Sequence, residues 1–269
     1  MTIAIDGHVH IYSDFSTSRF FDAAWENCSK LSSGQGLPTS PDCALFLTEG
    51  GENNVFKTLW QMAESQHQVS VDSFRFLRTG ESNSLIVEKG DKRMFFFAGR
   101  QHVSQENIEL LSLFSKHKIN DRSLPLAELA QTVVDNGGVV VLPWGVGKWF
   151  GKRGDVVKRL LTSDRNIPLF CGDNGNRPLL WPTPSLLRFA RKNHIPILSG
   201  SDPLPLASHC NRVASFGTLL LQGKLPKSHP AASLRDQLSK VENLREFGSR
   251  YNPVRFFCDQ LRINLFNRR

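Results

Sequence analysis

Short apolar runs recur along the chain, and most of them end in a polar or glycine-rich segment. Runs of this length that are rich in Val, Ile, Leu and Phe are typical of buried β-strands. This recurrence constrains the fold more than any single motif, because a strand that is apolar throughout needs cover on both faces. The strands that we predict cover residues 2–6, 43–48, 94–98, 138–142, 167–171, 195–199 and 216–221.

Stretches with the helical spacing of apolar residues lie between most of these runs. The helices that we predict cover residues 18–28, 105–116 (with Ser104 as N-cap), 125–135, 154–162 and 184–193. Helices that alternate with buried strands are typical of a parallel sheet. Seven such strands predict an α/β fold, a distorted (βα)7-type barrel of the TIM-like kind. An open doubly wound sheet is the alternative.

Residues 72–98 interrupt this alternation. Their pattern predicts three antiparallel strands with turns near Gly80-Glu81 and Gly90-Asp91, which we interpret as a β-meander inserted into the barrel. Residues 30–42 form a loop rich in Gly, Pro and Ser, a candidate flap near the site. Because no linker is evident, we predict a single domain over residues 1–269.

The composition fits a globular protein with an ample core, since 40% of the 269 residues are hydrophobic. The net charge of +8 suits a phosphorylated or otherwise anionic partner. The basic residues are spread along the chain without a block of like charges, and no recognisable motif for DNA or RNA binding accompanies them. We therefore expect an anionic small-molecule substrate, and we do not expect nucleic acid to be the main partner.

The cysteines and the N-terminus indicate the compartment. The five cysteines are widely spaced and include no C-x-x-C pair, so we expect buried thiols and no disulfide framework or zinc knuckle. The N-terminus lacks the basic and apolar regions of a signal peptide, and no apolar run has the length of a membrane span. We therefore expect a cytoplasmic protein without a membrane segment.

Polar side chains gather where the predicted strands end. Asp6, His8 and His10 follow the first strand, Glu49 the second, and Asp202 a late one. In parallel α/β folds these carboxyl ends meet at one edge, where ligands bind. His8 and His10 point to the same face of a strand, so their imidazoles could hold one divalent cation together with carboxylates from other strands. The alternative is a strand end whose histidines form ordinary hydrogen bonds.

The segments DGHVH (6–10) and GSD (200–202) resemble those of the PHP (polymerase and histidinol phosphatase) family, and related amidohydrolase and TatD-type hydrolases begin in a similar way. The resemblance implies a distorted seven-stranded barrel with two or three bound metal ions, which in many members cleaves phosphate esters. By this resemblance His8, His10 and Asp202 are metal ligands. Glu49 and His102 match further ligand positions more weakly.

The chain departs from the family pattern at two positions. The family has a histidine two residues after the late aspartate, where this chain has Leu204. The aspartate that follows the first motif is displaced by one residue, because Asp14 stands beside the expected position and Phe15 occupies it. We therefore expect a reduced centre with one or two metal ions, of zinc, manganese or iron.

Other polar residues near strand ends are candidates for catalysis and substrate binding. Asp6 or Asp173 could orient a ligand histidine or act as a base. Turns, buried salt bridges or a solvated basic face would explain the same residues without a function. The candidates for substrate binding are Arg100, Gln101, Lys148, Asn174, Arg177 and Arg212.

Two functions are compatible with these patterns. The first is a metal-dependent hydrolase that cleaves a phosphate ester, or acts on another anionic small molecule, with water activated by the metal. The second is a non-catalytic member of the same fold that binds a small molecule or a protein. The missing late histidine favours the second.

Overall fold

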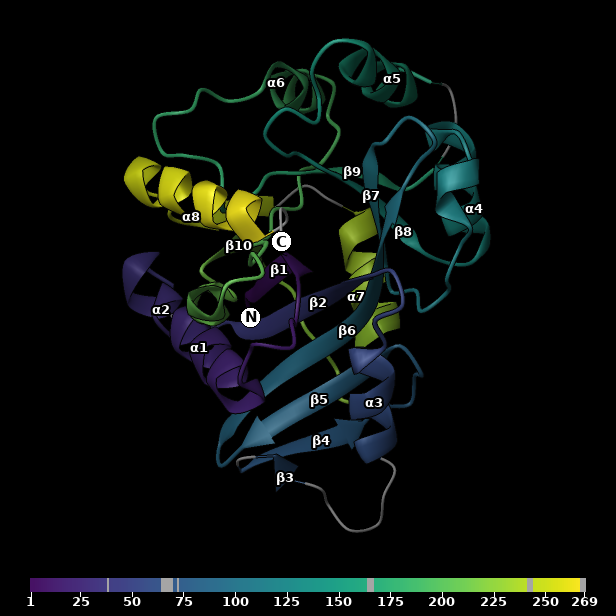
Figure 1. The fold of residues 1–269 in the computed structure, drawn as a ribbon. Coiled ribbons are helices and arrows are strands. Elements are labelled where there is room, and N and C mark those ends of the chain that lie inside the picture. The colour runs from purple at the N-terminus through teal and green to yellow at the C-terminus, as the bar shows by residue number, and fades with distance from the viewer. Residues whose placement is uncertain (38, 64–69, 72, 164–166, 241–243, 267–269) are drawn as a thin grey trace.

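The structure, a computed structural model, describes residues 1–37, 39–63, 70–71, 73–163, 167–240 and 244–266. Helices and strands alternate over most of this length (Figure 1). The helices are α1 (Thr17–Ser29), α2 (Leu31–Gly34), α3 (Val55–Met62), α4 (Leu126–Asp135), α5 (Lys152–Leu161), α6 (Ser185–Lys192), α7 (Pro230–Ser239) and α8 (Pro253–Phe266). The strands are β1 (Ile3–Val9), β2 (Asp42–Gly50), β3 (Ser70–Val71), β4 (Phe74–Arg78), β5 (Ser84–Lys89), β6 (Lys92–Val103), β7 (Glu109–Leu113), β8 (Val139–Pro143), β9 (Leu169–Gly172), β10 (Phe216–Leu220) and β11 (Leu244–Gly248).

The strands form one mixed sheet that curls. Its order is β11-β10-β1-β2-β6-β5-β4-β3, and β7, β8 and β9 continue from β6. The curl comes from β6, whose first half pairs with β5 and whose second half pairs with β7, both antiparallel. Its other edge pairs with β2 in parallel. One long strand thus belongs both to the flat part of the sheet and to its curled part.

Residues 196–202 connect the end of the curled part back to β1. The N–H group of Leu198 donates to the carbonyl oxygen of Cys171 in β9 at 2.8 Å. On the other side, the N–H group of Gly7 in β1 donates to the carbonyl oxygen of Ser199 at 3.1 Å. The predicted strand over 195–199 is therefore an irregular segment that makes strand-like bonds to two neighbours.

The α/β class and the barrel-like curl agree with the prediction, but the sheet is not the parallel sheet of a regular (βα)7 barrel. β7, β10 and β11 pair with their neighbours in the antiparallel direction. The predicted meander is present in β4, β5 and β6, which pair in sequence. Residue 72, where we placed its start, lies outside the described residues.

The predicted helix over 105–116 is wrong, because this region contains β7. Ser104 caps no helix. Instead it begins a tight turn in which the N–H group of Asn107 donates to the carbonyl oxygen of Ser104 at 2.8 Å. Asn107 adopts the left-handed conformation that such turns favour, with φ of 60°. β7 is apolar on both faces, since Leu110 and Leu111 pack into different clusters, and a strand of this kind can mimic helical spacing.

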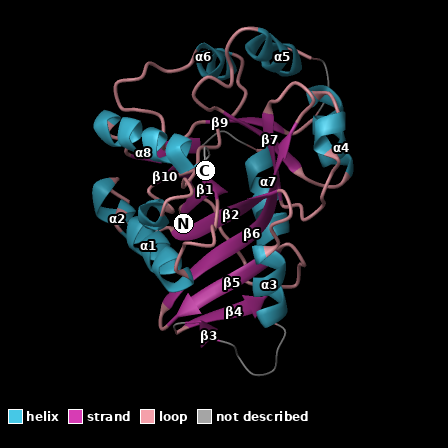
Figure 2. Cartoon of the chain, in the orientation of Figure 1, coloured by secondary structure: helices cyan, strands magenta, loops and turns pink. Residues whose placement is uncertain are grey.

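Helices cover both faces of the sheet (Figures 1 and 2). On β2, Leu45 packs in one cluster with Phe21 of α1, whereas the next residue, Phe46, packs in another with Leu234 of α7. This alternation is what a strand buried on both faces produces. A third cluster joins α4, α5 and α6 to β8 and β9. The apolar residues of the strands are thus buried in these three clusters. Polar side chains lie where β1, β2 and β6 end.

The segment 30–42 is bracketed by a disulfide between Cys28 and Cys43, so the expectation of buried thiols is wrong for these two, whereas Cys171 and Cys210 are buried thiols. The spacing gave no sign of the disulfide because Cys28 and Cys43 belong to different elements, α1 and β2, that meet only in the fold. The segment begins with the short helix α2, and residue 38 lies outside the described part. In the ranges that the structure describes, no helix combines the length and apolar character of a membrane span.

Candidate metal centre

The end of β1 places the two histidines. Residues 3–6 of β1 pair in register with β2, and the register then shifts between Asp6 and Val9. Thr48 of β2 stabilises the shifted end, because its hydroxyl donates to the carbonyl oxygen of Val9 at 3.1 Å. His8 and His10 lie on either side of Val9 and therefore share a face of the strand. Val9 itself is buried in the core.

Asp202 reaches the histidines from the segment 196–202. Its N–H group donates to the carbonyl oxygen of His8 at 2.9 Å, and this bond places the backbone of Asp202 next to that of His8. Its φ of 45° lies in the left-handed region, which turns the chain out of this segment immediately afterwards. Asn174 donates to the carboxylate, and Asn176 donates to the backbone carbonyl oxygen of Asp202 at 2.5 Å. Residues far apart in sequence thus fix this one side chain.

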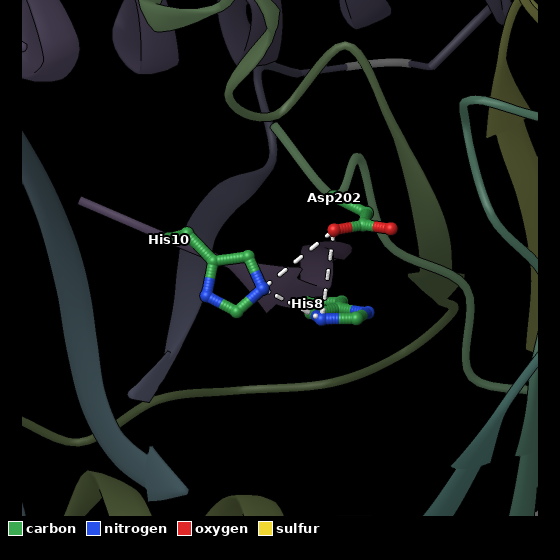
Figure 3. A group of neighbouring side chains, drawn as sticks. All are labelled: His8, His10 and Asp202. Carbon is green, nitrogen blue, oxygen red and sulfur yellow. Dashed lines mark hydrogen bonds and ion pairs between the residues drawn. The ribbon is translucent and has the colours of Figure 1, made fainter. Parts of the chain in front are cut away.

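The three side chains converge (Figure 3). The Nε2 atoms of His8 and His10 are 3.0 Å apart, and each lies 3.6–3.7 Å from the Oδ1 atom of Asp202. Ligands bonded to one tetrahedral ion at about 2.0–2.1 Å are roughly 3.3 Å from one another. The triangle therefore has nearly the size that one shared ion requires. Among the described residues, these three form a group of potential ligands within 4.8 Å of one another.

The environment favours the protonation states that bind metal. Burial and the neighbouring His8 lower the pKa of His10 to about 4, so its ring is neutral near pH 7. Burial opposes ionisation of Asp202, but the two imidazoles and the amide of Asn174 together hold the pKa of its carboxyl below the usual value. A neutral imidazole and a carboxylate are good ligands for divalent zinc, iron or manganese. A hydrogen bond between two neutral rings would give the same distance between the histidines.

A cavity of about 360 Å³ opens over this cluster. Gln101 and Lys148, both predicted for substrate binding, line it. The Oε1 atom of Gln101 is 3.4 Å from the Nε2 atom of His8, and Lys148 forms an ion pair with Glu109. Leu204, at the position where the family has a histidine, also lines the cavity. It supplies an apolar wall in place of a ligand.

The sequence did not point to three residues that line this cavity, namely Tyr12, Asn53 and Glu109. Tyr12 continues the alternation of His8 and His10, and that alternation could have identified it. Glu109 was hidden because β7 was predicted as a helix. Asn53 lies in the loop between β2 and α3, and no sequence pattern predicts the path of that loop.

Glu49 and His102, the weaker ligand matches, lie apart from the cluster. The Oε1 atom of Glu49 accepts hydrogen bonds from the N–H groups of Val55 and Phe56, so the carboxylate caps α3. The ring of His102 points to the other face of β6, where its Nε2 atom lies 3.0 Å from the Oγ atom of Ser112. The structure therefore does not bring these two side chains to the metal centre.

The two predicted catalytic carboxylates are buried in hydrogen-bond networks. Asp6 accepts hydrogen bonds from the backbone of His8, Ser201 and Ala214 and from the Ser201 hydroxyl. Burial outweighs these bonds and raises the pKa of Asp6 to about 6. Asp173 forms a two-point ion pair with the fully buried Arg177 at 2.5 and 2.9 Å. Neither carboxylate belongs to the residues that line the cavity.

The remaining substrate-binding candidates differ in their positions. Asn174 contacts the centre through Asp202. Arg100 donates to the carbonyl oxygens of Gly51 and Asn53, at 3.2 and 2.6 Å. Arg212 donates to the carbonyl oxygen of Gly175 at 3.0 Å, and its guanidinium lies 3.8 Å over the ring of Tyr251. Arg100, Arg177 and Arg212 therefore support the loops around the cavity and do not face into it.

No protein-family model and no curated protein matches the sequence, whereas several solved structures match the fold. PsfC from Pseudomonas syringae PB-5123 has a TM-score of 0.56 at 14% sequence identity, over 98% of this chain and 99% of that one. The lesion-specific endonuclease PfuEndoQ from Pyrococcus furiosus has a TM-score of 0.51 at 12% identity, over 91% of this chain and 58% of that one. Identities this low show similarity of fold alone.

A two-domain protein from Bacteroides vulgatus, described as containing a predicted PHP-like metal-dependent phosphoesterase, is also similar. The TM-score is 0.48 at 13% identity, over 93% of this chain and 65% of that one. The description of this neighbour names the PHP family, to which the segments DGHVH and GSD pointed. This chain spans less than two thirds of the Bacteroides and Pyrococcus chains.

One expectation about partners is corrected by these comparisons. From dispersed charge and the lack of a motif, we did not expect nucleic acid to be the main partner. A lesion-specific endonuclease has the same fold, so nucleic acid cannot be set aside as a partner class on those grounds. The physical reason is that single side chains, backbone N–H groups and helix N-termini can all contact phosphates, so neither a basic block nor a dedicated motif is required.

Proposed function

We propose that this chain is a metal-dependent hydrolase that cleaves phosphate esters. The triangle of His8, His10 and Asp202 carries the proposal, since two imidazoles and a carboxylate converge at nearly the spacing that one ion requires. The fold, which is similar to that of PsfC and PfuEndoQ, is compatible with this activity. The candidate substrates range from a small phosphate monoester to a nucleic-acid strand.

A divalent cation, when bound there, would supply activated water and polarise a phosphoryl oxygen. The chain's own residues would prepare the rest of the site. Asn174 and Asn176 hold the carboxylate and the backbone of Asp202 in place, as partners of metal ligands commonly do. Lys148 lies at the cavity wall, where it would attract an anionic group after exchanging its contact with Glu109.

Three ligands also allow a second function. A non-catalytic member of this fold would keep the cavity for binding and would have lost part of the metal centre. Two observations favour it: Leu204 replaces the expected histidine, and Glu49 caps α3 away from the centre. A protein of this kind would bind its ligand in the cavity over His8 and His10 without turnover.

Elemental analysis of the purified protein tests the proposal. The wild type, given zinc, manganese or ferrous ion and then desalted, is expected to retain about one equivalent of metal. The His8→Ala/His10→Ala variant should retain none, because both nitrogen ligands are gone. A His117→Ala/His229→Ala variant, which removes two exposed histidines, serves as the matched control and should behave like the wild type.

The metal-loaded protein is then assayed against phosphate monoesters, phosphodiesters and duplex DNA that carries a lesion. Turnover that is lost in the His8→Ala/His10→Ala variant supports the hydrolase. Metal binding with no turnover on any substrate would instead favour the binding function. If the wild type stays free of metal, the histidines are strand-end hydrogen-bonding residues and the proposal is wrong.

A further inference from the structure

A second cavity lies on the other face of the sheet from the metal centre. Its volume is about 340 Å³, within the range of small-molecule sites. Arg100 lines it, whereas the next residue of β6, Gln101, lines the metal cavity. Neighbouring side chains of a strand point to opposite faces, so the two cavities are separated by the sheet. We call this second cavity the basic pocket.

The basic pocket has an excess of positive charge. Lys57, Arg100 and Lys116 line it, with Glu49 as the only carboxylate among its described lining residues, and this leaves two positive charges. Glu49 is already engaged, because it caps α3 and lies 3.7 Å from the guanidinium of Arg100. In the part of the chain that the structure describes, no carboxylate pairs with Lys57 or Lys116. The charge of these two lysines is therefore uncompensated.

Both lysine side chains are exposed at the mouth of the pocket, and one of the two charges is partly desolvated there. Lys116 lies 5.7 Å from the centre of the Trp60 ring, and burial lowers the pKa of its ammonium group. A cation that loses water without gaining a counterion destabilises its surroundings. An anion bound between the two lysines would remove that cost. A dianion matches the excess of two charges better than a monoanion does.

The rest of the pocket combines apolar and aromatic walls with the amide side chains of Asn54 and Gln61, and the guanidinium of Arg78 lies 3.3 Å over the Trp60 ring. Phe56 and Trp60 of α3 and Ala98 of β6 form its walls. Phe56 and Ala98 are buried, so their positions are fixed by the core. A ligand that fills this volume therefore needs a flat or apolar body as well as a charged end. A free inorganic ion would leave most of the apolar wall without contact.

We propose that the basic pocket binds an aromatic compound that carries a phosphoryl group, with the dianion between Lys57 and Lys116 and the ring against Trp60. The site is separate from the metal centre and does not depend on the proposed function. It offers two recognition elements of different kinds, charge and an aromatic wall. Loss of either element should weaken binding, and this makes the site testable without any assay of turnover.

Tryptophan fluorescence and calorimetry test the proposal with phenylphosphonate, whose carbon–phosphorus bond resists hydrolysis. We expect saturable binding and a change in fluorescence that disappears in a Trp60→Phe variant. The Lys57→Gln/Lys116→Gln variant should bind at least tenfold more weakly, since each charged contact contributes on the order of tenfold. Phenol and inorganic phosphate, each with one of the two recognition elements, should also bind at least tenfold more weakly.

Two further variants make the outcome decisive. Lys192→Gln/Lys224→Gln removes the same charge from exposed positions elsewhere and should leave binding unchanged. His8→Ala/His10→Ala should also leave it unchanged, because those residues belong to the metal centre. The proposal is overturned if phenylphosphonate does not bind at about 10 mM. It is equally overturned if the histidine variant loses binding while the Lys57→Gln/Lys116→Gln variant keeps it.

Discussion

At the scale of single residues, burial decides what the titratable side chains can do. His102 shows this outside the metal centre. Its ring is 3% exposed, and burial lowers its pKa to about 4, although the nearby Asp121 acts in the opposite direction. In the unfolded chain the same ring would titrate near pH 6.5. The folded state therefore keeps His102 neutral at pH values where the unfolded state protonates it.

This difference predicts a pH dependence of stability. Between pH 6.5 and 4 the unfolded chain binds the extra proton, so His102 makes the protein less stable as the pH falls through this window. The wild type should therefore lose its advantage in unfolding free energy over a His102→Asn variant by about 2 kcal/mol when the pH is lowered from 7 to 5. Urea denaturation of both proteins at the two pH values measures it. A gap that does not change with pH would contradict the burial of a neutral ring.

The ion pair of Arg177 and Asp173 makes a second prediction for single residues. Both side chains are fully buried. An Arg177→Met change leaves a buried carboxylate without its main partner, and such losses cost about 3–5 kcal/mol of unfolding free energy. An Arg188→Met change at an exposed position should cost under about 0.5 kcal/mol. Chemical denaturation compares the two, and a small effect at Arg177 would show that Asp173 is not held in place by this pair.

At the scale of elements, hydrophobic patterning predicted those parts of the fold that are governed by local sequence. The strands β1, β2, β8 and β10 and the helices α1, α4 and α5 lie within a few residues of their predicted positions. β7 was missed because a short strand buried on both faces has no distinctive period. Helices α3, α7 and α8 were also missed. Helix α7 begins at Pro230, yet its weak apolar stripe gave little signal.

The candidate metal centre, too, could be predicted only where local sequence determines its geometry. His8 and His10 were predictable because one strand sets their spacing, and Asp202 because its motif follows an apolar run. Whether Glu49 joins them depends on the loop after β2, which folds back into α3 and takes the carboxylate as its cap. The sequence is compatible with Glu49 as a metal ligand and with Glu49 as the cap of a helix. The path of the chain after β2 decides which of these roles it takes.

Glu49 therefore gives a prediction for α3. A Glu49→Gln change keeps an oxygen that can accept from Val55 and Phe56 but removes the charge at the helix N-terminus and next to Arg100. We expect a loss of about 1–2 kcal/mol in unfolding free energy with unchanged metal content. Asp202→Asn should show the reverse, with metal lost and stability little changed. Elemental analysis and thermal denaturation of both variants would show whether Glu49 is a ligand.

At the scale of the whole molecule, closure of the curled sheet and the convergence of His8, His10 and Asp202 depend on the same contact. The segment 196–202 bonds to β9 on one side and to β1 on the other, and Asp202 ends it. Gly200 allows the close approach, because a Cβ atom at this position would lie 2.4 Å from the backbone nitrogen of His8. The segment GSD thus needs Gly200 because its backbone packs directly against the backbone of β1.

A Gly200→Ala change tests this coupling. The added methyl group must push the segment away from β1, which we expect to lower the unfolding free energy by about 1–3 kcal/mol. Because Asp202 moves with the segment, metal affinity should fall at least tenfold even in the folded fraction. Gly34→Ala is the control, since a Cβ atom there meets nothing within 4 Å. A Gly200→Ala protein that loses stability yet binds metal as tightly as the wild type would show that the centre does not depend on how the sheet closes.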